Sequence, residues 1–350
     1  MRAVCAAAFS LVLLLCSARV CAGQEAESSG ISAPVFEFHS GFWVNLHHFL
    51  YLQGRIRSAR ADAVLGQAQI PSPYKLASME GMSPEQGHAW NESVQTYADS
   101  WSSRDLLLNN QMVLINDRLA ELEDCPDLAG RAATECTSGI VPQLEIALDK
   151  AAPIYRQRWW PEQDRLNRAW IAAMTPLLRS MGATLAGELE EIYQSRWPAR
   201  IHVDVVYYAG PQGAYTSLAP LHVVMATADS RNQKLTGFET LFYEASHTLA
   251  GGVENAIERE CRRLQKPIPR DLWHALLLYT AEKRIARLAP GASAGARPNA
   301  GSKSLLPGSG NALADRGWRD YELLLEQYWQ PYLDGHVELD TAVAHLINAI

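Results

Sequence analysis

The chain has 350 residues, of which 31 are lysine or arginine and 38 are aspartate or glutamate, so its formal net charge is -7. An acidic chain without basic runs argues against nucleic acids and anionic membrane surfaces as partners. The length suffices for one large domain or two modest ones, with a full-sized core.

The first 22 residues have the features of a secretory signal peptide. Arg2 supplies a short positive start, residues 6–15 form an apolar run too short to span a bilayer, and Val20, Cys21 and Ala22 form a cleavage site. No later segment has 18 consecutive apolar residues. The sequence therefore predicts a secreted or periplasmic protein without a membrane span.

Residues 35–198 are expected to form a helical region. The stretch FWVNLHHFLYLQGRIR places its apolar side chains on one stripe at helical spacing. The residues SPEQ predict a helix start, with Ser83 as the N-cap and Gln86 closing a capping box. A long helix is predicted from Pro161, with a bend at Pro176.

Three cysteines remain after the predicted signal peptide. Cys125 and Cys136 lie in a polar loop, and an oxidising compartment favours a disulfide between them. Cys261 then has no cysteine partner and is expected to be a buried thiol. The cysteine and histidine pairs that a zinc knuckle needs are absent from the sequence.

Two strands are predicted after Pro198. Residues 201–208, IHVDVVYY, alternate at a period of two, and residues 219–228, APLHVVMATA, follow a turn that contains glycine and proline. These strands and the surrounding helices predict an α-rich α+β fold, with a small sheet in a core formed by residues 199–288.

The remainder of the chain is expected to be a loop followed by helices. Residues 289–317 are rich in glycine, alanine, serine and proline, which is typical of a flexible loop, and residues 318–350 return to a helical pattern.

The stretch TGFETLFYEASHTLAGG is predicted to be an amphipathic helix. Thr236 and Glu239 are expected to form a capping box at its start, and Gly251 and Gly252 to end it. The helix would have a length of about 14 residues, close to the usual length of helices in globular proteins.

This helix contains half of the H-E-x-x-H motif of zinc peptidases. In the intact motif two histidines at i and i+4 share one Zn²⁺, and the glutamate is the general base for the metal-bound water. Here Glu244 has the position of the base and His247 that of the second ligand, but Tyr243 replaces the first histidine. A neutral phenol is a poor zinc ligand. Zinc bound by Tyr243 and His247 is therefore expected to be held weakly or lost.

The order of strands, YEASH helix and the following helix LWHALLLYTAEK resembles the gluzincin-type zincin metallopeptidases, over roughly residues 200–288. The resemblance implies a third zinc ligand from a glutamate on the following helix, where Glu282 is the candidate. His274 on the same helix is the alternative, either as a ligand or as a hydrogen-bond donor to the transition state.

Other histidines are expected to be structural. His47 and His48 are adjacent, so a helix points them about 100° apart and they do not easily face one metal ion. The same interpretation is given to His39 and His222.

Two functions of different classes follow from these observations. One is a secreted zinc-dependent peptidase or hydrolase, in which Glu244 is the base, a peptide or protein is the substrate, and Tyr243 weakens or abolishes activity. The other is a non-catalytic protein that binds a peptide or a glycan in the same cleft.

Overall fold

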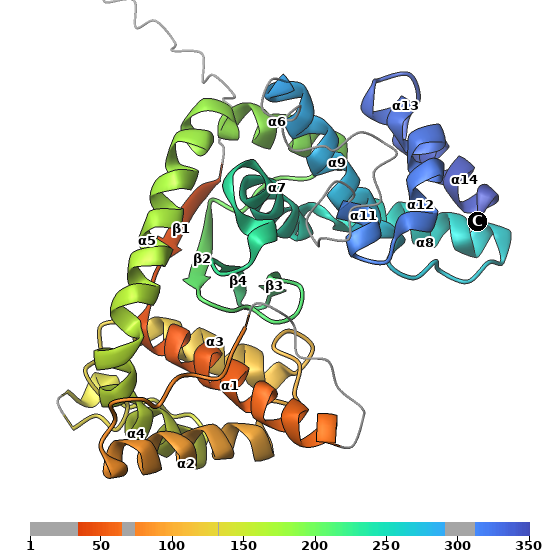
Figure 1. Cartoon of the computed structure of the whole chain (residues 1–350). Helices are drawn as coiled ribbons and strands as arrows, with labels where there is room; N and C mark the ends of the chain where they lie inside the picture. The colour runs from red at the N-terminus through yellow and green to blue at the C-terminus, as the bar shows by residue number, and fades with distance from the viewer. Residues whose placement is uncertain (1–33, 65–73, 132, 291–311) are drawn as a thin grey trace, which may run out of the picture. The chain divides into compact units, whose positions relative to one another are not determined.

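The computed structural model describes residues 34–64, 74–131, 133–290 and 312–350. These residues belong to one compact unit, which is mostly helical and contains a four-stranded sheet (Figure 1). The expected α+β class is therefore confirmed. The predicted signal peptide at residues 1–22 and most of the predicted flexible loop at 289–317 lie outside the described residues.

Most of the described residues are in helices, and these helices lie on both sides of the sheet. Those that precede strand β2 are α1 (Phe42–Val64), α2 (Pro84–Ser100), α3 (Asn110–Glu121), α4 (Pro142–Arg158), α5 (Trp160–Leu177) and α6 (Ala183–Tyr193). Those that follow the sheet are α7 (Lys234–Ala245), α8 (Gly251–Leu264), α9 (Leu272–Leu288), α11 (Ala312–Asp315), α12 (Arg319–Leu324), α13 (Gln330–Leu333) and α14 (Leu339–Ala349).

The sheet has the strand order β1-β2-β4-β3. Its strands are β1 (Val35–His39), β2 (Arg200–Val206), β3 (Ala214–Leu218) and β4 (Leu221–Ala226). The pairs β1–β2 and β2–β4 are parallel, and the edge strand β3 is antiparallel to β4. Strands β2 and β4 match the two strands predicted from the sequence.

Strands β1 and β3 were not predicted. β1 lies at the start of the region that was expected to be helical, and β3 begins within the predicted turn before the second strand. Both are only five residues long. Such short strands are held by pairing with β2 and β4, and neither is long enough to show a clear alternation by itself.

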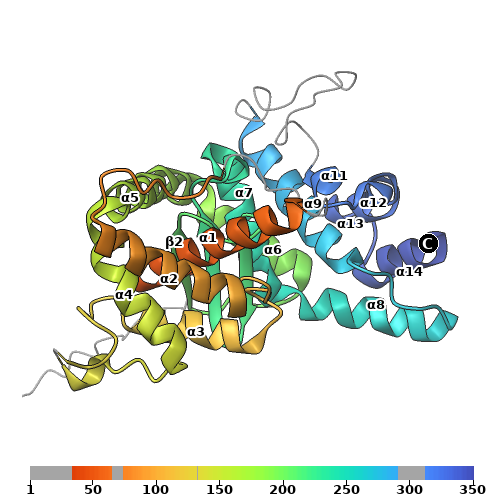
Figure 2. The ribbon, with the colours of Figure 1, turned by 60° about the horizontal axis from the view of Figure 1, so that its bottom comes forward.

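Each face of the sheet is covered by its own apolar core. On one face Ile201, Val203 and Met225 pack with residues of α5, α6, α7 and α9, whereas on the other Val206 and Val224 pack with residues of α1 to α4. Figures 1 and 2 show these helices on the two sides of the strands. The alternation of side chains along a strand thus decides which core each residue enters.

Several local predictions are confirmed. Cys125 and Cys136 form a disulfide, and Cys261 is a buried free thiol. Ser83 and Gln86 form the expected capping box at the start of α2. Among the described residues, no helix is both long and apolar enough to cross a membrane.

The boundaries of the YEASH helix differ from the prediction. Helix α7 begins at Lys234, before Thr236, and its N-cap residue, Gln233, makes no side-chain capping bond. The Thr236 hydroxyl instead donates to the carbonyl of Gln233 at 2.6 Å, so the expected capping box at Thr236 is wrong. The α-helix ends at Ala245, and a 3₁₀ turn, Ser246–Leu249, carries the chain onward.

The two glycines after this turn start a helix rather than end one. Helix α8 begins at Gly251. A Cβ atom on Gly252 would lie 2.8 Å from the carbonyl oxygen of Tyr193, at the end of α6. Glycine at position 252 therefore allows the start of α8 to approach the end of α6 closely.

Candidate metal centre

Three side chains with metal-ligating atoms lie on the sheet face that packs against the N-terminal helices. His202 and Asp204 are two residues apart on β2, so they point to the same side. His222 on β4 is paired directly with His202 in the parallel register. The pairing of β2 and β4 therefore brings two imidazoles and one carboxylate together.

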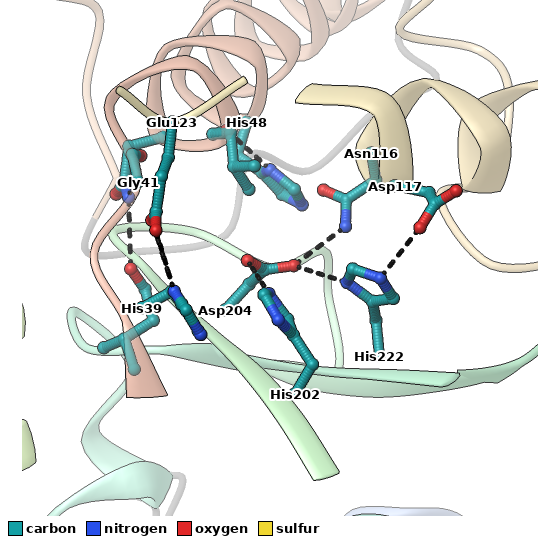
Figure 3. Close-up of polar contacts among 12 residues, drawn as sticks. His39, Gly41, His48, Asn116, Asp117, Glu123, His202, Asp204 and His222 are labelled. Atoms are coloured by element: carbon teal, nitrogen blue, oxygen red, sulfur yellow. Dashed lines mark hydrogen bonds and ion pairs between the residues drawn. The ribbon is translucent and has the colours of Figure 1, made fainter. Parts of the chain in front are cut away.

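The Asp204 carboxylate bonds to both histidine rings (Figure 3). Its Oδ1 is 2.9 Å from His202 Nε2, and its Oδ2 is 3.1 Å from His222 Nδ1. One ligand atom from each of the three side chains lies within 4.8 Å of the other two, so the group could hold a metal ion. Asp204 is only 2% exposed, whereas 25% of the His202 side chain is accessible to solvent.

Helix α3 holds this group from outside. Asn116 Nδ2 donates to Asp204 Oδ2 at 3.1 Å, and Asp117 Oδ1 accepts from His222 Nε2 at 3.0 Å. A carboxylate on the second nitrogen of a histidine fixes the orientation of the ring and increases its basicity as a ligand. The bond to Asp117 leaves His222 Nδ1 directed at Asp204 (Figure 3).

A third histidine extends the cluster towards solvent. The ring of His39 on β1 stacks on that of His202 at 4.2 Å between centroids, and the His222 ring lies 4.3 Å from His202 on the other side. His39 Nδ1 is 3.1 Å from the Glu123 carboxylate, and both side chains are about one-third exposed. The row of three rings therefore ends at the surface of the protein.

Charges within the cluster compensate one another. Burial raises the pKa of Asp204, but its hydrogen bonds and charge interactions with His202 and His222 are stronger, and the net effect lowers that pKa. Burial lowers the pKa of His222, but Asp204 and Asp117 leave it above 6.5. The carboxylates on both ring nitrogens favour the protonated form of His222, and a metal ion at Nδ1 would take the place of one proton.

His47 and His48 have local hydrogen bonds that fit the structural role expected for them. His48 Nδ1 donates to the carbonyl of Val44 at 2.9 Å, and His48 Nε2 accepts from the Tyr215 hydroxyl at 3.0 Å. His47 Nδ1 is 2.8 Å from the Tyr97 hydroxyl. Burial lowers the pKa of both histidines.

The residues of the YEASH stretch lie on the other side of the sheet. Tyr243 is 1% exposed, and its ring is 5.0 Å from that of His247. Burial and the charge of Glu244 raise the pKa of Tyr243 above 10. A phenol that keeps its proton so firmly is a weak metal ligand, so the nearby Arg316 does not lower this pKa enough to supply a phenolate.

Glu244 and His247 already have protein partners. The Thr216 hydroxyl on β3 lies 3.0 Å from Glu244 Oε2, and the Glu244 carboxylate is 3% exposed. His247 Nδ1 donates to the carbonyl oxygen of Glu244 at 2.8 Å. The expected base is thus held against the edge strand.

Of the two candidates on α9, the structure brings His274 next to His247. Their ring centroids are 5.4 Å apart. Glu282 lies eight residues further along α9, which corresponds to about 12 Å along the helix axis. The structure thus groups Tyr243, Glu244, His247 and His274, and places Glu282 two turns away from His274.

His202 and Asp204 were not among the site residues predicted from the sequence, and His222 was expected to be structural. The signal was present in IHVDVV, because His-x-Asp in a predicted strand puts both side chains on one face. Comparison of the chain with protein-family models, curated proteins and solved structures finds no match. The interpretation of the centre therefore depends on its geometry.

Proposed function

We propose that the protein binds a divalent transition-metal ion, zinc, through His202, Asp204 and His222. The observation that carries the proposal is the convergence of two imidazole nitrogens on one buried carboxylate, within 4.8 Å of one another. The metal thus lies on the sheet face opposite the YEASH helix.

The donor set fits zinc in number and type. Zinc takes histidine nitrogens and carboxylate oxygens at about 2.0–2.2 Å, which places neighbouring ligand atoms about 3.3 Å apart in a tetrahedral site. The two nitrogen–oxygen distances, 2.9 and 3.1 Å, run to different oxygens of Asp204, and the three ligand atoms lie within 4.8 Å of one another. Binding would therefore need the three side chains to draw closer together around one metal position.

The surroundings of the three ligands also favour a metal site. Asp117 and Asn116 each bond to a ligand side chain, which is the kind of outer support that metal-binding histidines and carboxylates have in proteins. A zinc ion with three protein ligands keeps a position for water and lowers the pKa of that water. His202 is the ligand nearest to solvent, and it marks the side from which an ion would enter.

The peptidase or hydrolase activity expected from the YEASH stretch is not part of this proposal. Glu244 is engaged by Thr216, and Tyr243 retains its proton. A non-catalytic role for that side of the sheet fits these contacts better.

Zinc titration of metal-free protein by calorimetry tests the proposal. We expect one ion per chain. Loss of an outer hydrogen-bond partner weakens metal binding by about 10–100-fold, so Asp117→Ala should lower the zinc affinity by that factor, and His222→Ala by more. His88→Ala is the matched control, because 76% of that side chain is exposed on α2.

A second pair of variants tests which face of the sheet binds the zinc ion. Tyr243→Phe and His247→Ala should leave the zinc affinity unchanged. Absence of zinc binding to the folded wild-type protein would refute the proposal. Binding that is lost in His247→Ala and retained in His222→Ala would assign the metal to the YEASH helix instead.

A further inference from the structure

The YEASH helix faces a cluster of aromatic rings from α9 and from the segment between α11 and α12. His247 lies 5.4 Å from both Trp273 and His274, measured between ring centroids. His274 stacks on Trp273 at 3.5 Å and lies 5.8 Å from Trp318. Figure 1 shows α11 beside α9 and α12 next to α11. Rings from distant parts of the chain therefore line one region.

A guanidinium group occupies the centre of this region. Arg316 Cζ lies 4.9 Å from the ring centroid of Tyr243 and 5.9 Å from that of Trp318. Its Nη2 is 3.7 Å from Glu244 Oε1. The cation is thus held by two aromatic rings and a carboxylate, a combination that suits planar cations.

The contact between Arg316 and Glu244 is loose for a buried ion pair. Glu244 is 3% exposed and Arg316 is 16% exposed, yet their closest atoms are further apart than a charge-assisted hydrogen bond of about 2.7–2.9 Å. A bidentate pair, the strongest arrangement for arginine and a carboxylate, is therefore not formed. The carboxylate retains capacity for a cation that can approach more closely.

His274 provides another unused polar atom beside the same rings. Its Nδ1 is buried and has no hydrogen-bond partner among the described residues, with the nearest carboxylate, that of Asp271, at 3.8 Å. Burial and the neighbouring His247 lower the pKa of His274 to about 4, so the ring is neutral at pH 7. Buried polar atoms without partners are rare and call for an explanation.

We propose that Glu244, Tyr243 and Trp318 form a binding site for the guanidinium group of a ligand, such as an arginine side chain, and that Arg316 fills this site in the absence of the ligand. The proposal explains why the acidic residue of the YEASH stretch is buried beside aromatic rings. It is independent of the proposed metal centre, which lies on the other face of the sheet.

Agmatine, a small alkyl guanidinium, is the probe for this site. In calorimetric titrations with EDTA present, Arg316→Ala should bind agmatine at least tenfold more tightly than the wild-type protein, because the internal competitor is removed. Millimolar agmatine should also recover the melting temperature that the variant loses. Arg319→Ala, a nearby exposed arginine, is the matched control and should behave like the wild-type protein.

Three further titrations test which groups of the protein and the ligand are recognised. Glu244→Gln in the Arg316→Ala background should abolish agmatine binding, and butylamine, which lacks the planar group, should bind at least tenfold more weakly than agmatine. A blocked tripeptide with a central arginine should bind like agmatine if the ligand is a peptide. Binding of agmatine alone also supports the site and restricts it to small molecules.

If Arg316→Ala fails to fold, Arg316→Lys keeps the charge without the planar group and should still bind agmatine more tightly than the wild-type protein. The proposal is overturned if agmatine binds none of the folded variants more tightly than the wild-type protein. It is also overturned if recovery of the melting temperature persists after Glu244→Gln. Arg316 and Glu244 would then be an internal ion pair only.

Discussion

Replacing Asp204 by asparagine should destabilise the metal-free protein strongly. The substitution keeps the size of the side chain but removes the charge that two histidines share, at 2.9 and 3.1 Å. Removing one partner of a buried ion pair costs about 3–5 kcal/mol. Since His222 keeps its bond to Asp117, we expect the lower end, a loss of about 3 kcal/mol in the free energy of unfolding.

The loss should depend on pH in a defined way. The folded-state pKa of Asp204 is lowered, so its contribution to stability is present above its unfolded pKa of about 4 and is lost as the pH falls. The folded-state pKa of His222 is raised, so its contribution is complete below about pH 6.5 and is lost as the pH rises through that pKa. The difference between wild type and Asp204→Asn should be largest between about pH 4 and 6.5.

Urea unfolding in the presence of EDTA measures this difference directly. Asp340→Asn is the control, because the Asp340 side chain is 76% exposed and its removal should change stability by no more than about 0.5 kcal/mol. In Asp204→Asn, NMR titration should also show a lower pKa for His222. A loss of less than about 1 kcal/mol in Asp204→Asn, with no change in that pKa, would refute the account of the cluster as a buried charge network.

Three other predictions concern parts of the fold around the two sites. Gly237→Ala should lower the free energy of unfolding by about 1–3 kcal/mol, because the new Cβ would lie 2.2 Å from the backbone carbonyl oxygen of Asn232. Gly251→Ala is the control in thermal unfolding, and it should leave the stability unchanged because the space around that position is open. Replacing Cys125 and Cys136 together by alanine should lower the free energy of unfolding by about 3 kcal/mol, since their disulfide closes a short loop; a loss below about 1 kcal/mol would contradict this. The pKa of His274 is lowered to about 4, so its contribution to stability should be lost as the pH falls from about 6.5 towards 4, and His274→Gln should weaken that dependence in pH-resolved melting curves.

Local sequence patterns predicted the elements that have a clear alternation of apolar residues or a clear capping motif. Strands β2 and β4 were expected from their alternation, and the start of α2 from the capping residues at Ser83 and Gln86. Strand β1 was not predicted from its five residues, because it is held by pairing with β2, which is distant in the chain and places Arg200 opposite Val35. The start of α7 was placed wrongly because Thr236 bonds within the helix instead of capping it.

The candidate site was only partly predictable for a similar reason. His202 and Asp204 could have been grouped from their spacing in one strand, and His222 from its place in the other predicted strand. The register that pairs His202 with His222 is a property of the assembled sheet. The support from Asn116 and Asp117 depends on how α3 packs against that sheet, which no local pattern specifies.

The position of a bound ion tests the central claim most directly. Crystals of the protein grown with one equivalent of zinc, measured with X-rays at the zinc absorption edge, would locate the ion by its anomalous signal. We predict one strong peak about 2.0–2.2 Å from His202 Nε2, His222 Nδ1 and an Asp204 carboxylate oxygen. A peak beside His247 with none at the sheet, or no peak at saturating zinc, would contradict it.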